Sequence, residues 1–423
     1  MQESENIKIA VRFRPLNQRE EGQDISFLKI DKNNIEIINE NDKTQNHKFI
    51  FDNVFNIDSN QEQVYNLVAK NAIEWFCQGY NSTIFTYGPT SSGKTHTMFG
   101  GKDKIQKGII PRSCETLFQC LKNNENISNY TLKCSFIEIY CEKIRDLLDS
   151  DKDADSLKLR NDVNKGIYIQ GLIEKFVYSS QDILDTIENG TLKRTVASTS
   201  LNSVSSRSHA VLTLKLNQVM TDGTEMSSKL HLIDLAGSEN VSKSEVQGIS
   251  LLEAQMINKS LSCLSNVIFA LTEKGRDHIP YRDSKLTFLL QDSLGGNSRT
   301  ILIATASPSI TSYSETLNTL KFAKRTKEIK NIPKINKNES VKDLLKIIDE
   351  LKNKISDFEN SKNGVDNYFF QNQKKLIEEL NKKIINERKK TIVLLKENQK
   401  FKIFYNSVKN LDKVKNLKKI IES

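Results

Sequence analysis

Residues 88–95 read Gly-Pro-Thr-Ser-Ser-Gly-Lys-Thr, which matches the phosphate-binding pattern G-x-x-x-x-G-K-[ST]. This loop follows the apolar segment Ser82 to Tyr87, a predicted strand, and precedes a segment with helical character. Glycines allow the backbone N–H groups of such a loop to close around phosphate oxygens, and a following helix N-terminus adds positive potential. In this strand–loop–helix context, the motif predicts a nucleoside triphosphate site on an α/β fold.

The motif also predicts what its residues bind. Lys94 is expected to reach the β- and γ-phosphates, and the Thr95 hydroxyl is expected to hold Mg²⁺. The predicted nucleotide-binding residues of the loop are Gly88, Pro89, Thr90, Ser91, Ser92, Gly93, Lys94 and Thr95. The motif leaves open what the energy of the nucleotide is used for.

Two further polar segments narrow the class of protein. Residues 202–209 read Asn-Ser-Val-Ser-Ser-Arg-Ser-His, and residues 234–239 read Asp-Leu-Ala-Gly-Ser-Glu at the end of an apolar segment. Serines can ligate Mg²⁺ or orient water, and arginine can pair with a carboxylate or stabilise charge. Asp234 can bind Mg²⁺ through water. Each segment alone could be an ordinary polar loop, whereas all three in this order indicate a phosphate-sensing site.

Strand-like and helix-like segments alternate between residues 7 and 330. The predicted strands are Ile7 to Phe13, Ser82 to Tyr87, Leu132 to Tyr140, Ala210 to Val219, Lys229 to Asp234 and Thr300 to Ser307. Helical spacing is clear in Gln61 to Phe76 and in Ile257 to Leu271. The alternation predicts an α/β domain over residues 1–331, with a central, mixed, mainly β-sheet flanked by helices on both faces.

The composition changes after Asn331. Residues 332–340 are polar and contain Pro333, which predicts an extended linker. Residues 341–363 carry a heptad pattern that favours a parallel two-stranded coiled coil. Its apolar a and d positions are Val341, Leu344, Ile348, Leu351, Ile355 and Phe358. A helix that packs against its own domain is the alternative.

Residues 364–423 are predicted to be a basic helical segment. Between Val365 and Ser423 there are 15 Lys/Arg and 7 Asp/Glu, so this part carries most of the net charge of +9. A basic segment can bind a polyanion, or it can be a solvated, lysine-rich helix face.

Other features of the sequence exclude classes of protein. No apolar run approaches the roughly 20 residues that a membrane span needs, and the polar N-terminus does not resemble a signal peptide. The six cysteines form no Cys-x-x-Cys pair and no cluster with histidine. We therefore expect reduced thiols in a cytoplasmic protein, without membrane insertion.

With these three motifs in place, the chain resembles the kinesin motor domain, from about Asn6 to Asn336. That family carries N-x-x-S-S-R-S-H as its first switch and D-L-A-G-S-E as its second, and both occur here intact. The likeness extends to RFRP from Arg12, FIEIYCEKIRDLL from Phe136, INKSLS from Ile257 and PYRDSKLT from Pro280. Myosins and small GTPases share the phosphate-binding loop but have different switches. The resemblance implies a P-loop motor domain that binds ATP and Mg²⁺ and hydrolyses ATP on microtubules.

The resemblance implies roles for residues around the nucleotide. Arg12, Pro15 and His96 resemble the residues that hold the adenine, and Tyr87 is expected nearby.

The switches carry the implied catalytic residues. Ser206 would join the Mg²⁺ or γ-phosphate shell, and Gly237 would sense the γ-phosphate. Arg207 and Glu239 would form a salt bridge that latches the switches, and Glu239 would also relay the proton of the attacking water. The implied metal-binding residues are Thr95, Ser206 and Asp234.

The resemblance also implies a track-binding face that meets the acidic surface of tubulin. Its implied contacts are Lys243, Asn258, Lys259, His278, Arg282 and Lys285, and Arg160 is a weaker candidate. Without the resemblance these would be scattered surface cations. Their contribution should fall as the salt concentration rises.

Among kinesins, the conventional class with an N-terminal motor is the most similar. The order of motor, linker and coil, with about six residues before the first strand, implies plus-end-directed movement by a homodimer on cytoplasmic microtubules, without nucleic acid. A non-motile microtubule-binding ATPase and a microtubule depolymerase are the alternatives. Four residues depart from the family pattern: Pro89, Gln255, Phe288 and Pro333. Pro333 could weaken docking of the linker or hold it extended.

Overall fold

The computed structural model describes residues 4–38, 46–101, 103–149, 157–162, 166–198, 206–239, 251–276 and 278–338, with short helical stretches beyond residue 344. The chain forms two compact units, Met1–Thr221 with Met226–Lys337, and Asp222–Glu225 with Asn338–Ser423. In the second unit, the described helical residues are 345–346, 348–350, 352–353, 375–379, 381–382 and 385. Most of the predicted coiled-coil seam and of the basic segment lies outside the described residues.

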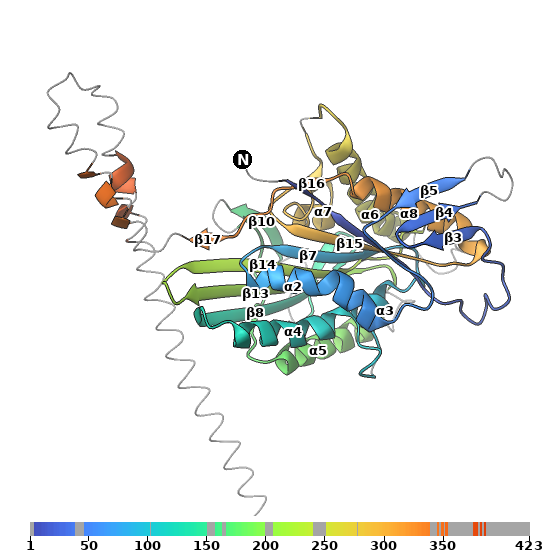
Figure 1. Cartoon of the computed structure of the whole chain (residues 1–423), viewed down its shortest axis with the longest axis horizontal. Coiled ribbons are helices and arrows are strands. Elements are labelled where there is room, and N and C mark those ends of the chain that lie inside the picture. The colour runs from blue at the N-terminus through green and yellow to red at the C-terminus, as the bar shows by residue number, and fades with distance from the viewer. Residues whose placement is uncertain are drawn as a thin grey trace, which may run out of the picture. The chain divides into compact units, whose positions relative to one another are not determined.

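The first unit is built on a mixed central sheet with the strand order β12-β8-β13-β14-β7-β15-β2-β6, and β9 pairs with β8 (Figure 1). Its strands are β2 (Lys8–Phe13), β6 (Asn53–Phe55), β7 (Ser82–Tyr87), β8 (Ile127–Tyr140), β9 (Lys143–Asp146), β12 (Lys175–Phe176), β13 (His209–Met220), β14 (Glu225–Asp234) and β15 (Arg299–Ala306). The predicted strands are thereby confirmed, with ends that differ by a few residues.

The direction of the strands changes across the sheet. The strand β7 pairs in parallel with β14 and β15, and β15 pairs in parallel with β2. On the other side, β8 runs antiparallel to β13, β9 and β12. All six residues of β7 are buried, as expected for a central parallel strand that is covered on both faces. The loop that leaves β7 therefore starts from a strand held on both sides and on both faces.

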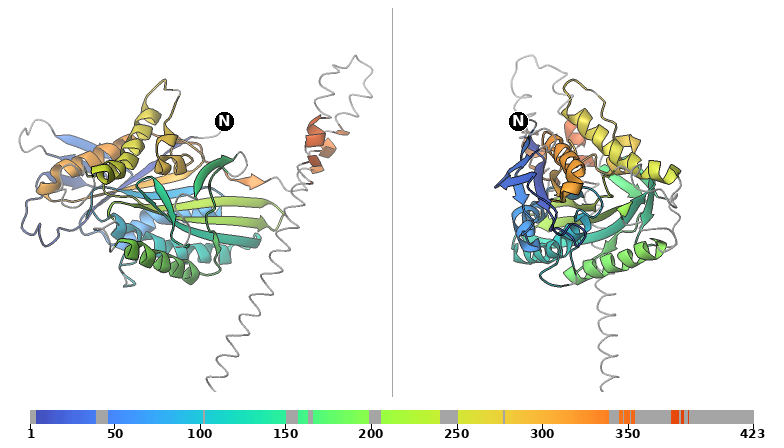
Figure 2. Two further views of the ribbon diagram at one scale, coloured as in Figure 1. Left: turned by 180° about the vertical axis from the view of Figure 1, so that it is seen from behind. Right: turned by 90° about the vertical axis from the view of Figure 1, so that its right-hand side faces the viewer.

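Helices cover both faces of the sheet. They are α1 (Gln61–Val64), the π-helical turn η1 (Tyr65–Ala69), α2 (Lys70–Cys77), α3 (Lys94–Met98), α4 (Ile109–Asn123), α5 (Ser180–Ser198), α6 (Leu251–Thr272), the 3-10 helix η5 (Tyr281–Asp283), α7 (Lys285–Leu289), the 3-10 helix η6 (Ile310–Ser312) and α8 (Tyr313–Thr326). Figure 2 shows α6 and α8 on one face and α2, α4 and α5 on the other. This arrangement confirms the predicted sheet flanked by helices.

Each face of the sheet has its own hydrophobic core. Alternate side chains of one strand enter different cores, so that Ile84 packs with α2 and α4 while Phe85 packs with α6 and α8. The same alternation in β15 places Ile301 in the core that contains Ile84, and Leu302 in the core that contains Phe85. Among the described helices, none is long and apolar enough to cross a membrane.

Smaller sheets lie outside the central one. They contain β3 (Leu28–Asp31), β4 (Asn34–Ile37) and β5 (His47–Ile50); β10 (Lys158–Asp162) and β11 (Gly166–Gln170); and β1 (Glu5–Asn6) and β16 (Lys330–Asn331). A further short strand, β17 (Lys337–Asn338), follows β16 along the chain and belongs to the central sheet, where it pairs with β14.

The segment after β16 is extended and hydrogen-bonded to the domain. The N–H of Ile332 donates to Gly296 O at 3.0 Å, the N–H of Lys334 to Asn297 Oδ1 at 2.7 Å, and the N–H of Asn336 to Gly79 O at 2.9 Å. These donors are two residues apart, so Pro333 falls between them.

Successive N–H groups of an extended chain point to opposite sides. The ring nitrogen of Pro333 therefore points away from the groups that bind its neighbours. Because proline has no N–H to donate, this is a position where its presence costs no hydrogen bond to the domain. The bound conformation of residues 332–336 is compatible with Pro333.

Candidate functional site

The phosphate-binding loop joins β7 to α3 by a tight path. At Gly88, an added Cβ would lie 2.1 Å from the backbone oxygen of Thr305 on β15, so only glycine fits there. Gly93 and Ser91 both have positive φ, 101° and 62°. Glycine adopts this conformation freely, whereas serine does so only when the surroundings hold it.

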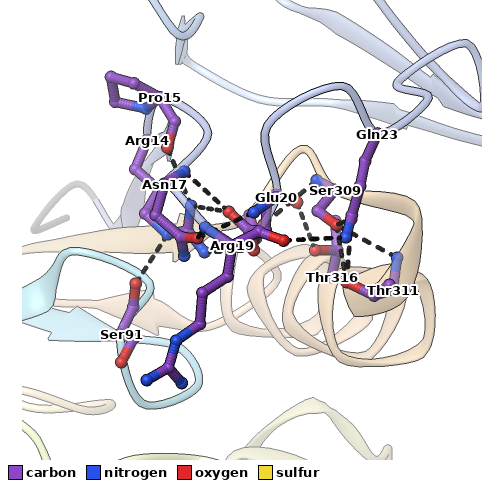
Figure 3. A network of polar contacts seen from close by, with 11 residues as sticks. Arg14, Pro15, Asn17, Arg19, Glu20, Gln23, Ser91, Ser309, Thr311 and Thr316 are labelled. Atoms are coloured by element: carbon purple, nitrogen blue, oxygen red, sulfur yellow. Dashed lines mark hydrogen bonds and ion pairs between the residues drawn. The ribbon is translucent and has the colours of Figure 1, made fainter.

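Arg14 is the residue that holds Ser91, and the sequence did not assign it this role (Figure 3). Its Nε donates to Ser91 O at 2.7 Å, and its two terminal nitrogens donate to the Glu20 carboxylate at 2.5 and 2.7 Å. Glu20 also accepts the N–H of Asn17 at 3.1 Å. Arg14, assisted by this N–H, lowers the pKa of Glu20 to about 2. The bidentate pair therefore remains ionised at neutral pH and fixes the loop from the side.

Lys94 is buried at the start of α3. Its Nζ donates to Gly88 O at 2.9 Å and to Pro89 O at 2.8 Å, so the ammonium group is held inside the curve of the loop. Burial lowers the pKa of Lys94, while the nearby carboxylates of Asp234 and Glu239 act in the opposite direction. A positive charge in this position can neutralise phosphate oxygens.

A hydroxyl and a carboxylate meet beside Lys94. The Thr95 hydroxyl donates to Asp234 Oδ2 at 2.6 Å, and the Thr86 hydroxyl donates to Asp234 Oδ1 at 3.2 Å. Burial raises the pKa of Asp234, and the hydrogen bond from Thr95 and the charge of Lys94 partly offset this effect. The structure thus brings together Thr95 and Asp234, two of the three residues that were predicted to bind metal.

An open cleft of about 630 Å³ lies over the loop. It is lined by Arg14, Pro15, Thr90, Ser91, Gly93, Lys94, Thr95, His96, Gln106, Ser206 and Leu235. Ser206, the third predicted metal ligand, therefore faces the same cleft as Lys94 and Thr95.

The residues that were predicted to hold the adenine are placed in different ways. Pro15 and His96 line the cleft, and burial lowers the pKa of His96. Arg12 lies in the wall of an adjoining cavity of about 270 Å³. Its guanidinium group is buried and donates to Gln61 Oε1 at 2.7 Å and to Thr97 Oγ1 at 3.0 Å. Through these bonds Arg12 connects Gln61 to Thr97 and stabilises the wall of this cavity.

The structure does not place Tyr87 at this cleft. Its ring stacks on Phe322 of α8 with the centroids 3.7 Å apart, and it lines a different cavity between α6 and α8. The reason is the alternation along β7, which directs Tyr87 to the same face as Phe85. Tyr87 therefore does not line this cleft, and its proximity to the adenine stays a prediction.

The second switch loop is bonded to both of the other loops. The N–H of Gly237 donates to Ser206 O at 2.8 Å, and the N–H of Ser238 donates to Gly88 O at 3.0 Å. A side-chain carbon at Gly237 would lie 2.3 Å from Thr90 Oγ1 and 2.4 Å from Glu239 Oε2. A larger residue at this position would therefore displace the side chains of Thr90 and Glu239 from where they now lie.

Glu239 does not have the partner that the sequence predicted. Its carboxylate accepts the backbone N–H of Thr90 at 2.7 Å and also the Thr90 hydroxyl. In the described part of the chain, no ion pair joins Glu239 to Arg207. The two donors of Thr90 hold this carboxylate against the phosphate-binding loop, so the expected salt bridge is not formed here.

The last residues of the first switch are hydrogen-bonded to a buried ion pair that the sequence did not predict. Arg194 of α5 donates to Glu138 Oε1 of β8 at 3.0 Å, and their side chains are only 9% and 1% exposed. The Ser208 hydroxyl donates to the same oxygen at 2.6 Å and accepts from Arg194 at 2.8 Å. This network ties residues 206–209 to β8 and α5.

The predicted track-binding residues are exposed where the structure describes them. Lys259 lies on α6, Arg282 on η5 and Lys285 on α7, and His278 precedes them in the loop. The Arg282 guanidinium lies 5.6 Å from the ring centre of Phe288, the residue that departs from the family pattern.

Three further residues were predicted to contact the track: Asn258, Lys243 and Arg160. Asn258 belongs to α6, but its side chain, like Lys243, lies outside the described residues. Arg160 is on β10 and donates to Gln170 Oε1 at 3.2 Å.

Comparison with known proteins gives consistent matches. The kinesin motor domain family model matches residues 12–329. The chain is 46% identical over 357 residues to kinesin-related protein 3 of Dictyostelium discoideum, a match that covers 83% of this chain and 30% of that protein. It is 45% identical over 335 residues to the kinesin heavy chain of Drosophila melanogaster, covering 78% of this chain and 34% of that protein.

A solved structure described as that of a fast kinesin, with implications for ATPase mechanism and interactions with microtubules, matches with a TM-score of 0.73 and 41% identity. The match covers 79% of this chain and 94% of that one. The chain spans about a third of the length of the curated relatives that it matches.

Proposed function

This chain belongs to the kinesin motor family, and from that premise we propose that it hydrolyses ATP in response to microtubules and moves toward their plus ends. The observation that carries the proposal is the bonding between the loops. The second switch donates to Ser206 O of the first switch through Gly237 and to Gly88 O of the phosphate-binding loop through Ser238. A change in the nucleotide at one loop must therefore disturb the others.

The donor set of the cleft suits ATP with Mg²⁺. Lys94 and the N–H groups of the loop would hold the phosphates, and Arg14 keeps the loop in shape. The oxygens of Thr95 and Asp234 are hard ligands of the kind that Mg²⁺ prefers, and Ser206 lines the same cleft. When bound, Mg²⁺ would supply charge stabilisation for phosphoryl transfer.

Hydrolysis in this scheme depends on Arg207 and Glu239, which do not form an ion pair in this structure. We expect Glu239 to leave Thr90 and to pair with Arg207 when the loops close around the γ-phosphate. Glu239 would then relay the proton of the attacking water, and Gly237 would offer its N–H to the phosphate. Positioning and charge stabilisation are sufficient for this chemistry because phosphoryl transfer does not need a strong base.

The track would be bound through exposed cations. Lys259, Arg282 and Lys285 stand on α6 and the elements that follow it, where their side chains can meet an acidic surface. Lys243, Asn258 and His278 are further contacts that we propose on the resemblance to the family. We also propose that the protein works in the cytoplasm, on cytoskeletal microtubules.

The direction of movement would come from residues 332–340, the proposed neck linker. In this structure Ile332, Lys334 and Asn336 are bonded to the domain. Release and rebinding of this segment would convert the nucleotide state into displacement. Residues 341–363 would form the neck coil of a homodimer, and residues 364–423 a basic helical segment.

The proposal is tested by the rate of ATP hydrolysis as a function of microtubule concentration. We expect strong stimulation in the wild type, loss of turnover in Lys94→Ala, and normal turnover in the control Lys122→Ala on the exposed side of α4. Glu239→Ala should bind ATP without hydrolysing it. Turnover that does not respond to microtubules would contradict the proposal, and normal turnover of Glu239→Ala would contradict the role of that residue.

A microtubule depolymerase is the second candidate that the same assay separates. Filaments that shorten from their ends in the presence of ATP would favour it over a motor. Stimulated turnover without movement or shortening would favour a non-motile binder.

A further inference from the structure

His209 connects two loops and a helix that are distant along the chain. It is the first residue of β13 and the last residue of the first switch segment. Its Nδ1 lies 3.0 Å from the backbone nitrogen of Ala236, and its Nε2 lies 2.8 Å from the hydroxyl oxygen of Ser260. Ala236 directly precedes Gly237 in the second switch, and Ser260 directly follows Lys259 on α6.

The two contacts determine which ring nitrogen carries the hydrogen. A backbone N–H can only donate, so Nδ1 must accept from Ala236 and is unprotonated. In the neutral ring the hydrogen is then on Nε2, which donates to the Ser260 hydroxyl. Each nitrogen is thereby committed to one partner, and neither bond can be exchanged for a bond to the other partner.

The surroundings keep the ring neutral. The side chain is 2% exposed, and burial lowers the pKa of His209 to about 3, assisted by the positive charges of Arg194 and Lys94. Protonation at Nδ1 would remove the acceptor for the Ala236 N–H. The ring is thus neutral at neutral pH, and both of its hydrogen bonds can form.

We propose that His209 is a positioning residue that couples the second switch to α6, so that a nucleotide-dependent movement of Ala236 and Gly237 is transmitted through the imidazole to Ser260 and the proposed track-binding surface. This inference deepens the proposed function and rests on it for its consequence on microtubules. Its structural part, the coupling between the switch and α6, concerns the motor alone.

The coupling is tested by hydrogen exchange of α6 peptides with ADP and with a non-hydrolysable ATP analogue. In the wild type we expect exchange of α6 to differ between the two nucleotides. Ser260→Ala removes the acceptor of the His209 Nε2–H and should abolish that difference, whereas Ser260→Thr, which retains a hydroxyl, should restore it. Ser265→Ala is the matched control, because the Ser265 hydroxyl donates within its own helix to Leu261 O, at 3.1 Å.

Two variants of His209 separate its two bonds. His209→Asn keeps an acceptor near Nδ1 and loses the donor to Ser260, whereas His209→Gln places its amide group near Nε2 and loses the acceptor for Ala236. Because transmission needs both bonds, both variants should lose the nucleotide-dependent difference. Microtubule-stimulated turnover should fall roughly fivefold in Ser260→Ala while turnover without microtubules stays within about twofold.

The outcomes distinguish this inference from the proposed function. A wild type without microtubule stimulation would contradict the function, while the exchange data would still decide the coupling. Exchange of α6 that responds to nucleotide equally in the wild type and in Ser260→Ala would overturn the inference, as would a wild type in which α6 does not respond.

Discussion

The substitution Glu138→Ala tests the importance of the ion pair beneath the first switch. Glu138 and Arg194 are 1% and 9% exposed, so solvent screens their interaction very little. Removal of one partner from such a pair typically costs about 3–5 kcal/mol, because the other charge stays buried. Arg194 would keep its bonds to Ser208, and we therefore expect a loss near the lower end, about 3 kcal/mol.

This loss can be measured by thermal unfolding. For a domain of this size, about 2 °C of melting temperature corresponds to 1 kcal/mol, so the midpoint should fall by about 6 °C. The control is Glu273→Ala, whose ion pair with Arg276 is 49% and 45% exposed and should contribute less than about 1 kcal/mol. If Glu138→Ala lowers the midpoint no more than Glu273→Ala does, the argument from burial is wrong.

Three further predictions concern helix packing, the linker and pH. Gly190→Ala should destabilise the domain in chemical denaturation although alanine favours helices, because the added carbon would lie 2.5 Å from Phe136 Cδ1; a stabilised variant would contradict this. Lys334→Pro should release the linker, seen as greater mobility of a spin label at residue 337, because it removes the bond to Asn297, whereas Pro333→Ala should leave the linker bound. Burial lowers the pKa of His231 to about 3. As the pH falls, the imidazole of the unfolded chain therefore binds a proton while that of the folded chain stays neutral. Stability should fall by about 2 kcal/mol for this residue as the pH drops from 7 to 5, and His231→Asn should show a shallower dependence.

The elements that the sequence predicted best are those with strong local signals. The predicted strand Ser82 to Tyr87 coincides with β7, because six residues buried on both faces form a continuous run that ends at a glycine. The predicted helix Ile257 to Leu271 lies within α6, Leu251–Thr272. The positions of Lys94 and Thr95 followed from the spacing of the motif alone.

Contacts between distant segments were not predictable in the same way. His209 stood in a recognised motif, but its partners, Ala236 and Ser260, lie on other elements and carry no signal of their own. The pair of Glu138 and Arg194 depends on the packing of α5 against β8. No pattern within either segment reveals which charge meets which.

Two expected neighbours are not in contact in this structure. Tyr87 stands next to the phosphate-binding loop in sequence, yet alternation along β7 sends its ring to the opposite face, against Phe322. Glu239 was paired with Arg207 by resemblance, whereas the nearer donors of Thr90 bind it in this structure. Neighbourhood in the sequence, or membership of a common motif, therefore does not by itself establish a contact in this structure.

Movement toward the plus ends of microtubules is the central claim made for this protein. The most direct measurement fixes the protein to a surface and follows microtubules with marked polarity in the presence of ATP. We predict that filaments glide with their minus ends leading and that Lys94→Ala stops them. Filaments that glide with their plus ends leading, or that bind without gliding while the wild type hydrolyses ATP, would contradict the claim.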